Sequence, residues 1–167
     1  MADYYFAKIM IGGKLNSSQI NDMYEIILDK HIEIFNLGGM RIPEDMRESF
    51  NREIDLSVKT TDLIVFESDD AKWGEYAYLQ EFLEDNNIPY VLESGPFYDN
   101  PERRKVFNPE NNQNSSQILI NGEEVLMKRD VREVIEMLKT GQNQAALKRL
   151  MYMCEEFSSE IPNAELI

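Results

Sequence analysis

The chain is predicted to be a single α+β domain of 167 residues with a ferredoxin-like split β-α-β sheet. Three observations favour this fold. Short β-rich runs alternate with helical-period segments over residues 1–94, Asn121-Gly122 marks a tight hairpin, and two amphipathic helices follow. The prediction is therefore a ferredoxin-like sheet over residues 1–167, with an added β-hairpin and a helical hairpin at 130–167 packed on it. A flavodoxin-like open parallel sheet is the alternative if residues 32–37 do not form a strand.

The first strand is expected at Tyr4–Ile11, an aromatic and β-rich run that ends at Gly12-Gly13. Asn16 then has the position of a helix N-cap, and Gln19 follows it at capping-box spacing. His31 falls one turn further along the apolar face of this helix. The apolar positions that recur there with helical spacing are Ile20, Met23, Tyr24 and Ile27.

The middle of the chain predicts a second β-α-β unit. Ile32–Leu37 suggests a short strand, and Pro43–Ile54 is ambiguous, with a short helix opened by Pro43 as one interpretation. Asp62–Glu67 reads as a buried central strand, and Ile88–Glu93 as a strand that starts at Pro89. Between them a helix is expected from about 71 to 85, capped by Ser68, Asp69 or Asp70.

The last third is expected to hold a loop, a hairpin and two helices. Residues 95–117 read mostly as loop, with a brief strand possible at Lys105–Phe107. Asn121-Gly122 predicts a type I′ turn between strands at 117–120 and 123–128. Asp130 caps a helix that Gly141 ends. A final helix from Asn143 to about Phe157 is expected to bury Leu147, Leu150, Met151 and Cys154.

Composition narrows the function classes. The formal net charge is −14 and the pI is about 4.5, which argues against direct nucleic-acid binding. The single cysteine, Cys154, fits a reducing compartment, and neither a signal peptide nor a membrane span is recognisable, so a cytoplasmic protein is expected. Cys154 is expected to be a buried hydrophobe, and His31 to lie at a helix end.

Negative charge is concentrated in one quarter of the chain. Residues 61–100 contain ten acidic side chains and one basic one, Lys72, so they carry −9 of the total. On the helix expected there, one side carries carboxylates and a tyrosine: Glu75, Tyr78, Glu81, Glu84 and Asp85. Such a surface is either simply solvated or a docking site for a basic partner, in which the carboxylates replace phosphates.

Three other groups of residues are candidate sites. Asp69, Asp70 and Glu75, with Glu67, could hold Mg²⁺ at a strand end, although N-capping explains the two aspartates equally well. Gly12-Gly13-Lys14 could cradle an anion, although a tight turn also accounts for it. The basic residues Arg103, Arg104 and Lys105 could pair with the acidic helix of the same chain or of a second copy, giving a homo-oligomer.

The stretch from Lys72 to Pro109 contains short motifs that are similar to those of a known protein family. The string KWGEY…LQEFLEDNNIPY…SGPFYDNPERRKVFNP is similar to a family of small acidic proteins encoded by phages, plasmids and integrative elements. That family has a G-E-[FY]-x-x-L-E-x-[FL] helix and a G-I-P-[YF] strand start, where this chain has Asn87 in place of the glycine. The opening Ile9–Gly13 (IMIGG) is similar as well. The resemblance implies a non-enzymatic protein that acts on host defence or nucleic-acid-handling machinery, and no catalytic residue carries over.

The sequence therefore gives three hypotheses. The first is a non-enzymatic protein, without a cofactor, whose acidic surface binds a basic, nucleic-acid-binding surface of a host protein. The second is a small metal-dependent α/β enzyme that acts on a phosphorylated ligand through Asp69, Asp70 and Glu75. The third is a homo-oligomeric structural protein in which the acidic surface meets Arg103–Lys105 of a neighbour.

Overall fold

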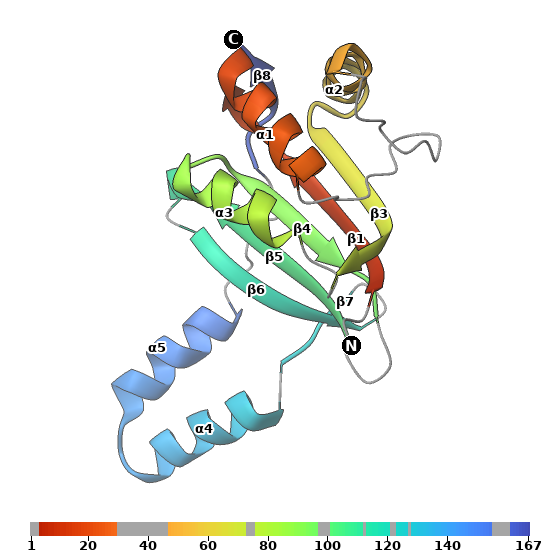
Figure 1. Cartoon of the computed structure of the whole chain (residues 1–167). Helices are drawn as coiled ribbons and strands as arrows, with labels where there is room; N and C mark the ends of the chain where they lie inside the picture. The colour runs from red at the N-terminus through yellow and green to blue at the C-terminus, as the bar shows by residue number, and fades with distance from the viewer. Residues whose placement is uncertain are drawn as a thin grey trace.

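The computed structural model describes residues 4–29, 47–72, 76–96, 101–111, 113–120, 123–126, 128–154 and 161–167. Its helices are α1 (Ser17–Asp29), α2 (Arg47–Thr61), α3 (Ala77–Asp85), the 3₁₀ turn η1 (Pro109–Asn111), α4 (Lys128–Lys139) and α5 (Asn143–Cys154). Its strands are β1 (Tyr4–Ile11), β2 (Gly13–Leu15), β3 (Ile64–Lys72), β4 (Tyr90–Ser94), β5 (Glu102–Asn108), β6 (Gln113–Ile120), β7 (Glu123–Glu124) and β8 (Ala164–Leu166). The α+β class is confirmed (Figure 1).

The main sheet has the order β3-β1-β4-β5-β6-β7, and every pairing in it is antiparallel. Because β3 and β4 both run antiparallel to β1, they are parallel to each other with β1 between them. Together with α3 they form the split β-α-β unit expected from the sequence. The flavodoxin-like alternative is wrong, because such a fold needs adjacent parallel strands in the main sheet.

Helices α1, α2 and α3 lie on one face of this sheet, and the hydrophobic core fills the space between the layers (Figure 1). Ile9, Ile11 and Phe66 are fully buried on the sheet side, because alternate residues of a strand face the same way. The aromatic rings of Tyr24, Phe50 and Phe66 follow one another with centroids 5.1 and 5.9 Å apart, which joins α1, α2 and β3. The helices add six further core residues: Ile20, Met23, Ile27, Ile54, Leu79 and Leu83.

The start of α1 confirms the predicted capping box. The Gln19 N–H donates to Asn16 Oδ1 at 3.0 Å, and the Asn16 N–H donates to Gln19 Oε1 at 2.9 Å. The end of α4 also follows the sequence. Gly141 has φ +76°, its N–H donates to Leu138 O, and the Gln142 N–H donates to Met137 O, the bonding pattern of a Schellman motif.

The strand–helix boundary in the acidic quarter was predicted wrongly. β3 continues to Lys72, and α3 begins only at Ala77, so Asp69 and Asp70 lie in a strand and do not cap a helix. They sit at a bulge where the pairing moves from Ala7↔Ser68 to Tyr5↔Ala71, with both aspartates opposite Phe6. The expected central position is also wrong, because among the described strands β3 pairs with β1 alone and forms an edge.

The predicted loop at 95–117 is the second clear error. It contains all of β5 and the first five residues of β6, and these two strands pair antiparallel from Glu102↔Leu119 to Asn108↔Gln113. The β6–β7 hairpin is confirmed by the pairs Leu119↔Glu124 and Ile120↔Glu123, but β7 ends at Glu124 and α4 already begins at Lys128. The turn residues 121–122, the expected strand at 32–37 and His31 lie outside the described residues.

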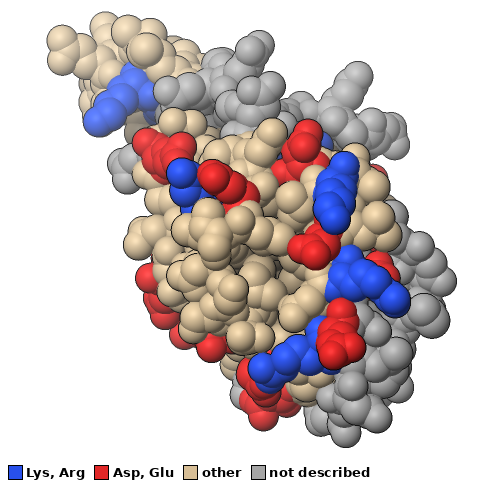
Figure 2. All heavy atoms as spheres, turned by 90° about the horizontal axis from the view of Figure 1, so that it is seen from above, with Lys and Arg blue, Asp and Glu red and all other residues tan. Residues whose placement is uncertain are grey.

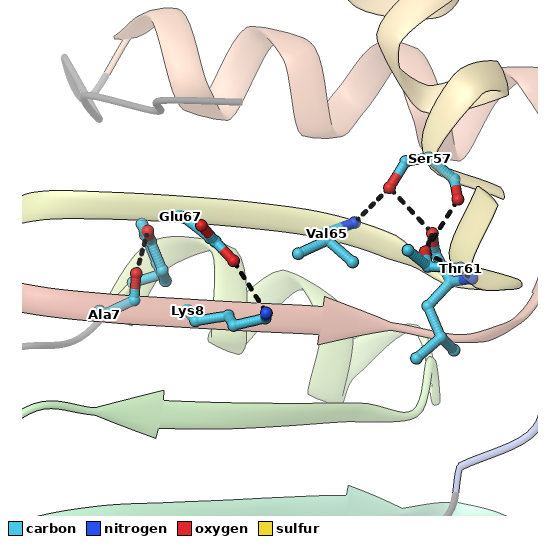
Figure 3. Close-up of polar contacts among 8 residues, drawn as sticks. Ala7, Lys8, Ser57, Thr61, Val65 and Glu67 are labelled. Atoms are coloured by element: carbon cyan, nitrogen blue, oxygen red, sulfur yellow. Dashed lines mark hydrogen bonds and ion pairs between the residues drawn. The ribbon is translucent and has the colours of Figure 1, made fainter. Parts of the chain in front are cut away.

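α2 is longer than the sequence suggested and is tied to β3 by a buried serine. The Ser57 side chain is fully buried, its hydroxyl donates to Leu63 O, and it accepts from the Val65 N–H, both at 3.0 Å (Figure 3). The Thr61 hydroxyl donates to Ser57 O at 2.8 Å. These bonds fix the turn by which the chain leaves α2 and enters the sheet.

The last described segment returns to the start of the chain. β8 pairs in parallel with β2, so residues 161–167 are not part of the helical hairpin expected at 130–167. A Cβ at Gly12 would lie 1.9 Å from Pro162 O, which explains why a glycine stands there. The hairpin proper, α4–α5, projects from the sheet, and its helices contact each other far more than they contact the strands (Figure 1).

Candidate binding groove between α3 and strands β4 to β6

An open groove of about 350 Å³ lies between α3 and the adjoining strands. It brings together residues that are far apart in the sequence, because β5 is paired to β4 directly beside α3. Its helix wall carries acids and its strand wall carries bases. The residues that line it are Ala77, Gln80, Glu81, Glu84, Asp85, Leu92, Ser94, Arg103, Lys105 and Ser116.

A polar network at the base of the groove joins the two walls. Glu84 Oε1 accepts a hydrogen bond from Tyr90 Oη at 2.5 Å and forms an ion pair with Lys105 Nζ at 2.7 Å. Gln80 Nε2 donates to Tyr90 Oη at 3.2 Å. Lys105 Nζ also lies 5.6 Å from the centroid of the Tyr90 ring. Glu84 is therefore an internal link between α3 and β5.

The protonation states follow from this geometry. Burial raises the pKa of Tyr90 to about 12, and its hydrogen bond to Glu84 acts in the same direction. Burial opposes ionisation of Glu84, but the hydrogen bonds from Lys105 and Tyr90 outweigh it and lower the pKa of the carboxyl. Burial likewise opposes the charge on Lys105, yet the hydrogen bond to Glu84 leaves the pKa of its ammonium raised. The pair is charged at neutral pH.

The outer side of the helix wall is exposed. Tyr78 is 56% exposed, and Glu81 and Asp85 are exposed and form no ion pair with another described residue. Of the five residues predicted for partner binding, these three lie at the surface, Glu84 is internal, and Glu75 lies outside the described residues. We call Tyr78, Glu81 and Asp85 the acidic edge of α3.

The strand wall explains the basic spot noted in the sequence. Lys105 pairs with Glu84, and Arg104, on the opposite face of the sheet, pairs with Glu93 at 2.9 Å. Pairing with the acidic helix of the same chain, one of the two possibilities, is thus observed for Lys105, whereas the partner of Arg104 lies on β4. Arg103 is exposed at the groove and has no ion pair with another described residue.

Other acids of the 61–100 quarter are also neutralised. Glu67 pairs with Lys8 at 2.8 Å across β1 and β3 (Figure 3), in addition to Glu84 and Glu93. Figure 2, which looks down on the end of the molecule that carries α1, α2 and β8, shows Lys and Arg side chains beside Asp and Glu side chains. Pairs of this end include Lys14–Glu165 and Arg47–Glu25. Fewer acidic side chains of residues 61–100 therefore remain without an ion pair to a described residue than the sequence implied.

Of the metal candidates, Glu75 and the side chain of Asp70 lie outside the described residues, so the metal site stays a prediction. Among the described residues, no three His, Cys, Asp or Glu side chains are close enough together to hold a metal ion. Asp69 lies near Tyr76, whose pKa is raised by burial and by the charges of Glu67 and Asp69. The N–H groups of Gly12 and Gly13 already donate to Pro89, Pro162 and Asn163 carbonyls, so they are not available to an anion.

The sequence did not indicate the groove itself. The part of its strand wall on β5 and β6 lies in a stretch that reads as loop, because Pro96, Pro101 and Pro109 interrupt it. The usable signal was the alternation in Arg103, Lys105 and Phe107, which share one face of β5.

No helix in the described part of the chain is long and apolar enough to cross a membrane. No known family model matches the chain, and neither the curated proteins nor the solved structures include a significant match.

Proposed function

We propose that this chain is a non-enzymatic interaction protein whose acidic edge of α3 binds a basic surface of a host protein. The observation that carries the proposal is the unequal use of the acids on this helix. Glu84 is held inside the fold by Lys105, whereas Glu81 and Asp85 remain exposed without an ion pair among the described residues. Acids that the fold does not use are available to a partner.

The chemistry of the acidic edge suits a nucleic-acid-binding surface. Two carboxylates one turn apart can occupy Lys or Arg side chains that otherwise contact phosphates. Tyr78, half-exposed beside them, adds the amphipathic contact area in which protein interfaces are enriched. Binding of this kind is steered by charge and weakens as salt screens it.

Arg103 sets the direction of approach. Its guanidinium lies on the strand wall of the same groove and repels a basic partner from that side. The partner therefore contacts the outer side of α3, over Tyr78, Glu81 and Asp85, and not the floor of the groove. The resemblance to mobile-element proteins supports a setting in the host cytoplasm, with a host defence or nucleic-acid-handling protein as the target.

Charge reversal tests the proposal against a defined probe. A fluorescent Arg/Lys-rich peptide titrated with the wild type at low salt gives the reference affinity. The double variant Glu81→Lys/Asp85→Lys should lose at least about tenfold in affinity, because each exposed pair contributes up to ~1 kcal/mol and reversal adds repulsion. Arg103→Glu should strengthen binding.

The matched control is Asp22→Lys/Asp55→Lys, which changes the net charge equally at two exposed helical acids outside the groove. It should lower affinity less than about threefold, the remaining effect of overall charge. Equal losses in both double variants would show nonspecific attraction and remove the acidic edge as a binding site. Binding that is insensitive to a tenfold rise in salt would also contradict the proposal.

A further inference from the structure

The α4–α5 hairpin carries a large apolar surface that the described chain leaves uncovered. Six of its aliphatic and methionine side chains are exposed by more than a third: Val131 39%, Ile135 44%, Leu138 48%, Leu147 59%, Leu150 36% and Met151 64%. In the described hairpin, Val134 and Ala146 are buried, at 3% and 0%, and mark where the two helices meet. Contiguous apolar patches of this kind on soluble proteins mark interaction sites.

These side chains form one face and not two. Val131, Ile135 and Leu138 fall within about 60° on α4, and Leu147, Leu150 and Met151 within about 100° on α5. Viewed from the N- to the C-terminus of each helix, the apolar stripe is rotated in the same direction away from the residue that contacts the other helix, Val134 or Ala146. Because the two helices are antiparallel, both stripes then face the same side of the hairpin. The resulting apolar face is roughly 18 Å long and two helices wide.

The charges around this face are basic. The hairpin, residues 128–154, holds six Lys or Arg and three Asp or Glu, so it carries +3 and the remaining chain carries −17. All three acids are used within the hairpin: Arg149 pairs with Asp130 and Glu133, and Lys139 pairs with Glu136. Lys128, Arg132 and Lys148 are exposed and form no ion pair with a described residue, and by helical periodicity they border the apolar stripes.

The charge and the burial of the surfaces decide which kind of molecule can cover the apolar face of α4–α5. A second copy of the hairpin brings an apolar face but the same basic border, so like charges meet. The acidic edge of a second copy brings the right charge, but α3 has its apolar side, Leu79 and Leu83, buried at 0% in the core. An anionic membrane attracts the hairpin but repels the −17 remainder of the same molecule.

We propose that the α4–α5 face is a docking site for an acidic amphipathic helix of a partner protein. The apolar side of that helix lies across the exposed stripes of α4 and α5, and its Asp or Glu side chains meet Lys128, Arg132 and Lys148. This is the helix-in-groove mode of recognition, with charge setting the choice of partner. The site is distinct from the acidic edge of α3, so the protein has two docking surfaces of opposite charge.

Three stapled peptides test the inference. One is an acidic amphipathic helix of about four turns with Leu at i, i+3, i+4 and i+7 positions flanked by Glu. The second has Lys in place of each Glu, and the third is a scrambled acidic peptide, since stapling removes the poor helicity of short peptides. Fluorescence anisotropy with the full-length protein should show the acidic helix binding at least about tenfold more tightly than the other two.

Variants locate the binding and keep the result interpretable. Lys128→Glu/Arg132→Glu/Lys148→Glu changes exposed residues that form no ion pair with the described part of the chain, and it should invert the preference toward the lysine peptide. Leu147→Gln/Met151→Gln should weaken the affinity for the acidic helix by at least about tenfold. The control Leu56→Gln, at a side chain 44% exposed on α2, should leave that affinity unchanged. Circular dichroism establishes that each variant is folded.

Three results overturn the inference. One is equal affinity for the acidic and lysine peptides, or no binding of either at about 100 µM. Another is a dimer in analytical ultracentrifugation that Leu147→Gln/Met151→Gln disrupts, which makes a second copy the occupant. The third is hairpin-dependent binding to phosphatidylcholine–phosphatidylserine vesicles in place of the peptide. None of these bears on the acidic edge of α3, whose test uses a basic probe and different residues.

Discussion

Helices α1 and α4 have the same apolar spacing but opposite surroundings. On α1, Ile20, Met23, Tyr24 and Ile27 are at most 9% exposed, because the sheet and α2 cover them. On α4, Val131, Ile135 and Leu138 are 39–48% exposed. The pattern therefore predicts a helix and identifies its apolar face in both cases. It does not reveal whether the same chain or another molecule covers that face.

The largest expected contrast is in stability. Phe66→Ala removes a fully buried ring between α2 and the sheet and should lower the free energy of unfolding by ~3–5 kcal/mol. Leu147→Ala, at a side chain 59% exposed on the hairpin, should lower it by less than ~1 kcal/mol. Urea denaturation followed by circular dichroism measures both. Similar losses for the two variants would mean that the hairpin is packed as tightly as the body.

The next effect concerns the link between α3 and β5. Glu84→Gln leaves Lys105 without its ionised partner and should cost ~1–3 kcal/mol of unfolding free energy. The control Glu81→Gln, on the same helix but exposed and without an ion pair to a described residue, should change stability by less than ~0.5 kcal/mol. If both variants were equally stable, the Glu84 network would contribute nothing to the fold.

The same pair predicts a pH dependence. The folded-state pKa of Glu84 is lowered, so its stabilisation is present above the unfolded pKa, ordinarily 4.5, and is lost as the pH falls through the folded pKa. The folded-state pKa of Lys105 is raised, so its stabilisation is present below 10.5 and is lost as the pH rises through the folded pKa. Thermal melts from pH 3 to pH 7 should show a smaller acid-side loss for Glu84→Gln than for the wild type.

The smallest expected effect is local to the hairpin. Gly141→Ala forces a Cβ into a backbone with φ +76° and should weaken the α4–α5 turn by ~1 kcal/mol, although no atom lies within 4 Å of that Cβ. Gly141→Asn, which tolerates this conformation better, should cost less. Amide hydrogen exchange should show faster exchange in α4 and α5 while β1 and β4 stay unchanged. A change of hydrogen exchange in β1 or β4 would contradict a local effect on the α4–α5 turn.

How far the sequence predicts the structure depends on whether local or distant residues decide it. The capping box of Asn16 and the Gly141 terminus were predicted because their partners lie within a few residues. The boundary at Lys72 and the strand β5 were missed because pairing with β1 and β4 overrides local turn and helix signals there. The site followed the same rule. The exposure of Glu81 and Asp85 agrees with helical periodicity, but the use of Glu84 inside the fold depends on Lys105, twenty-one residues away.

The parallel pairing of β2 with β8 sets an order for biosynthesis. Residues 13–15 leave the ribosome early, yet their strand partner at 164–166 is made about 150 residues later. The apolar face of α4–α5 therefore emerges before the body can close around β2. A partner or a chaperone can therefore contact the α4–α5 face of a nascent chain before β2 has its strand partner.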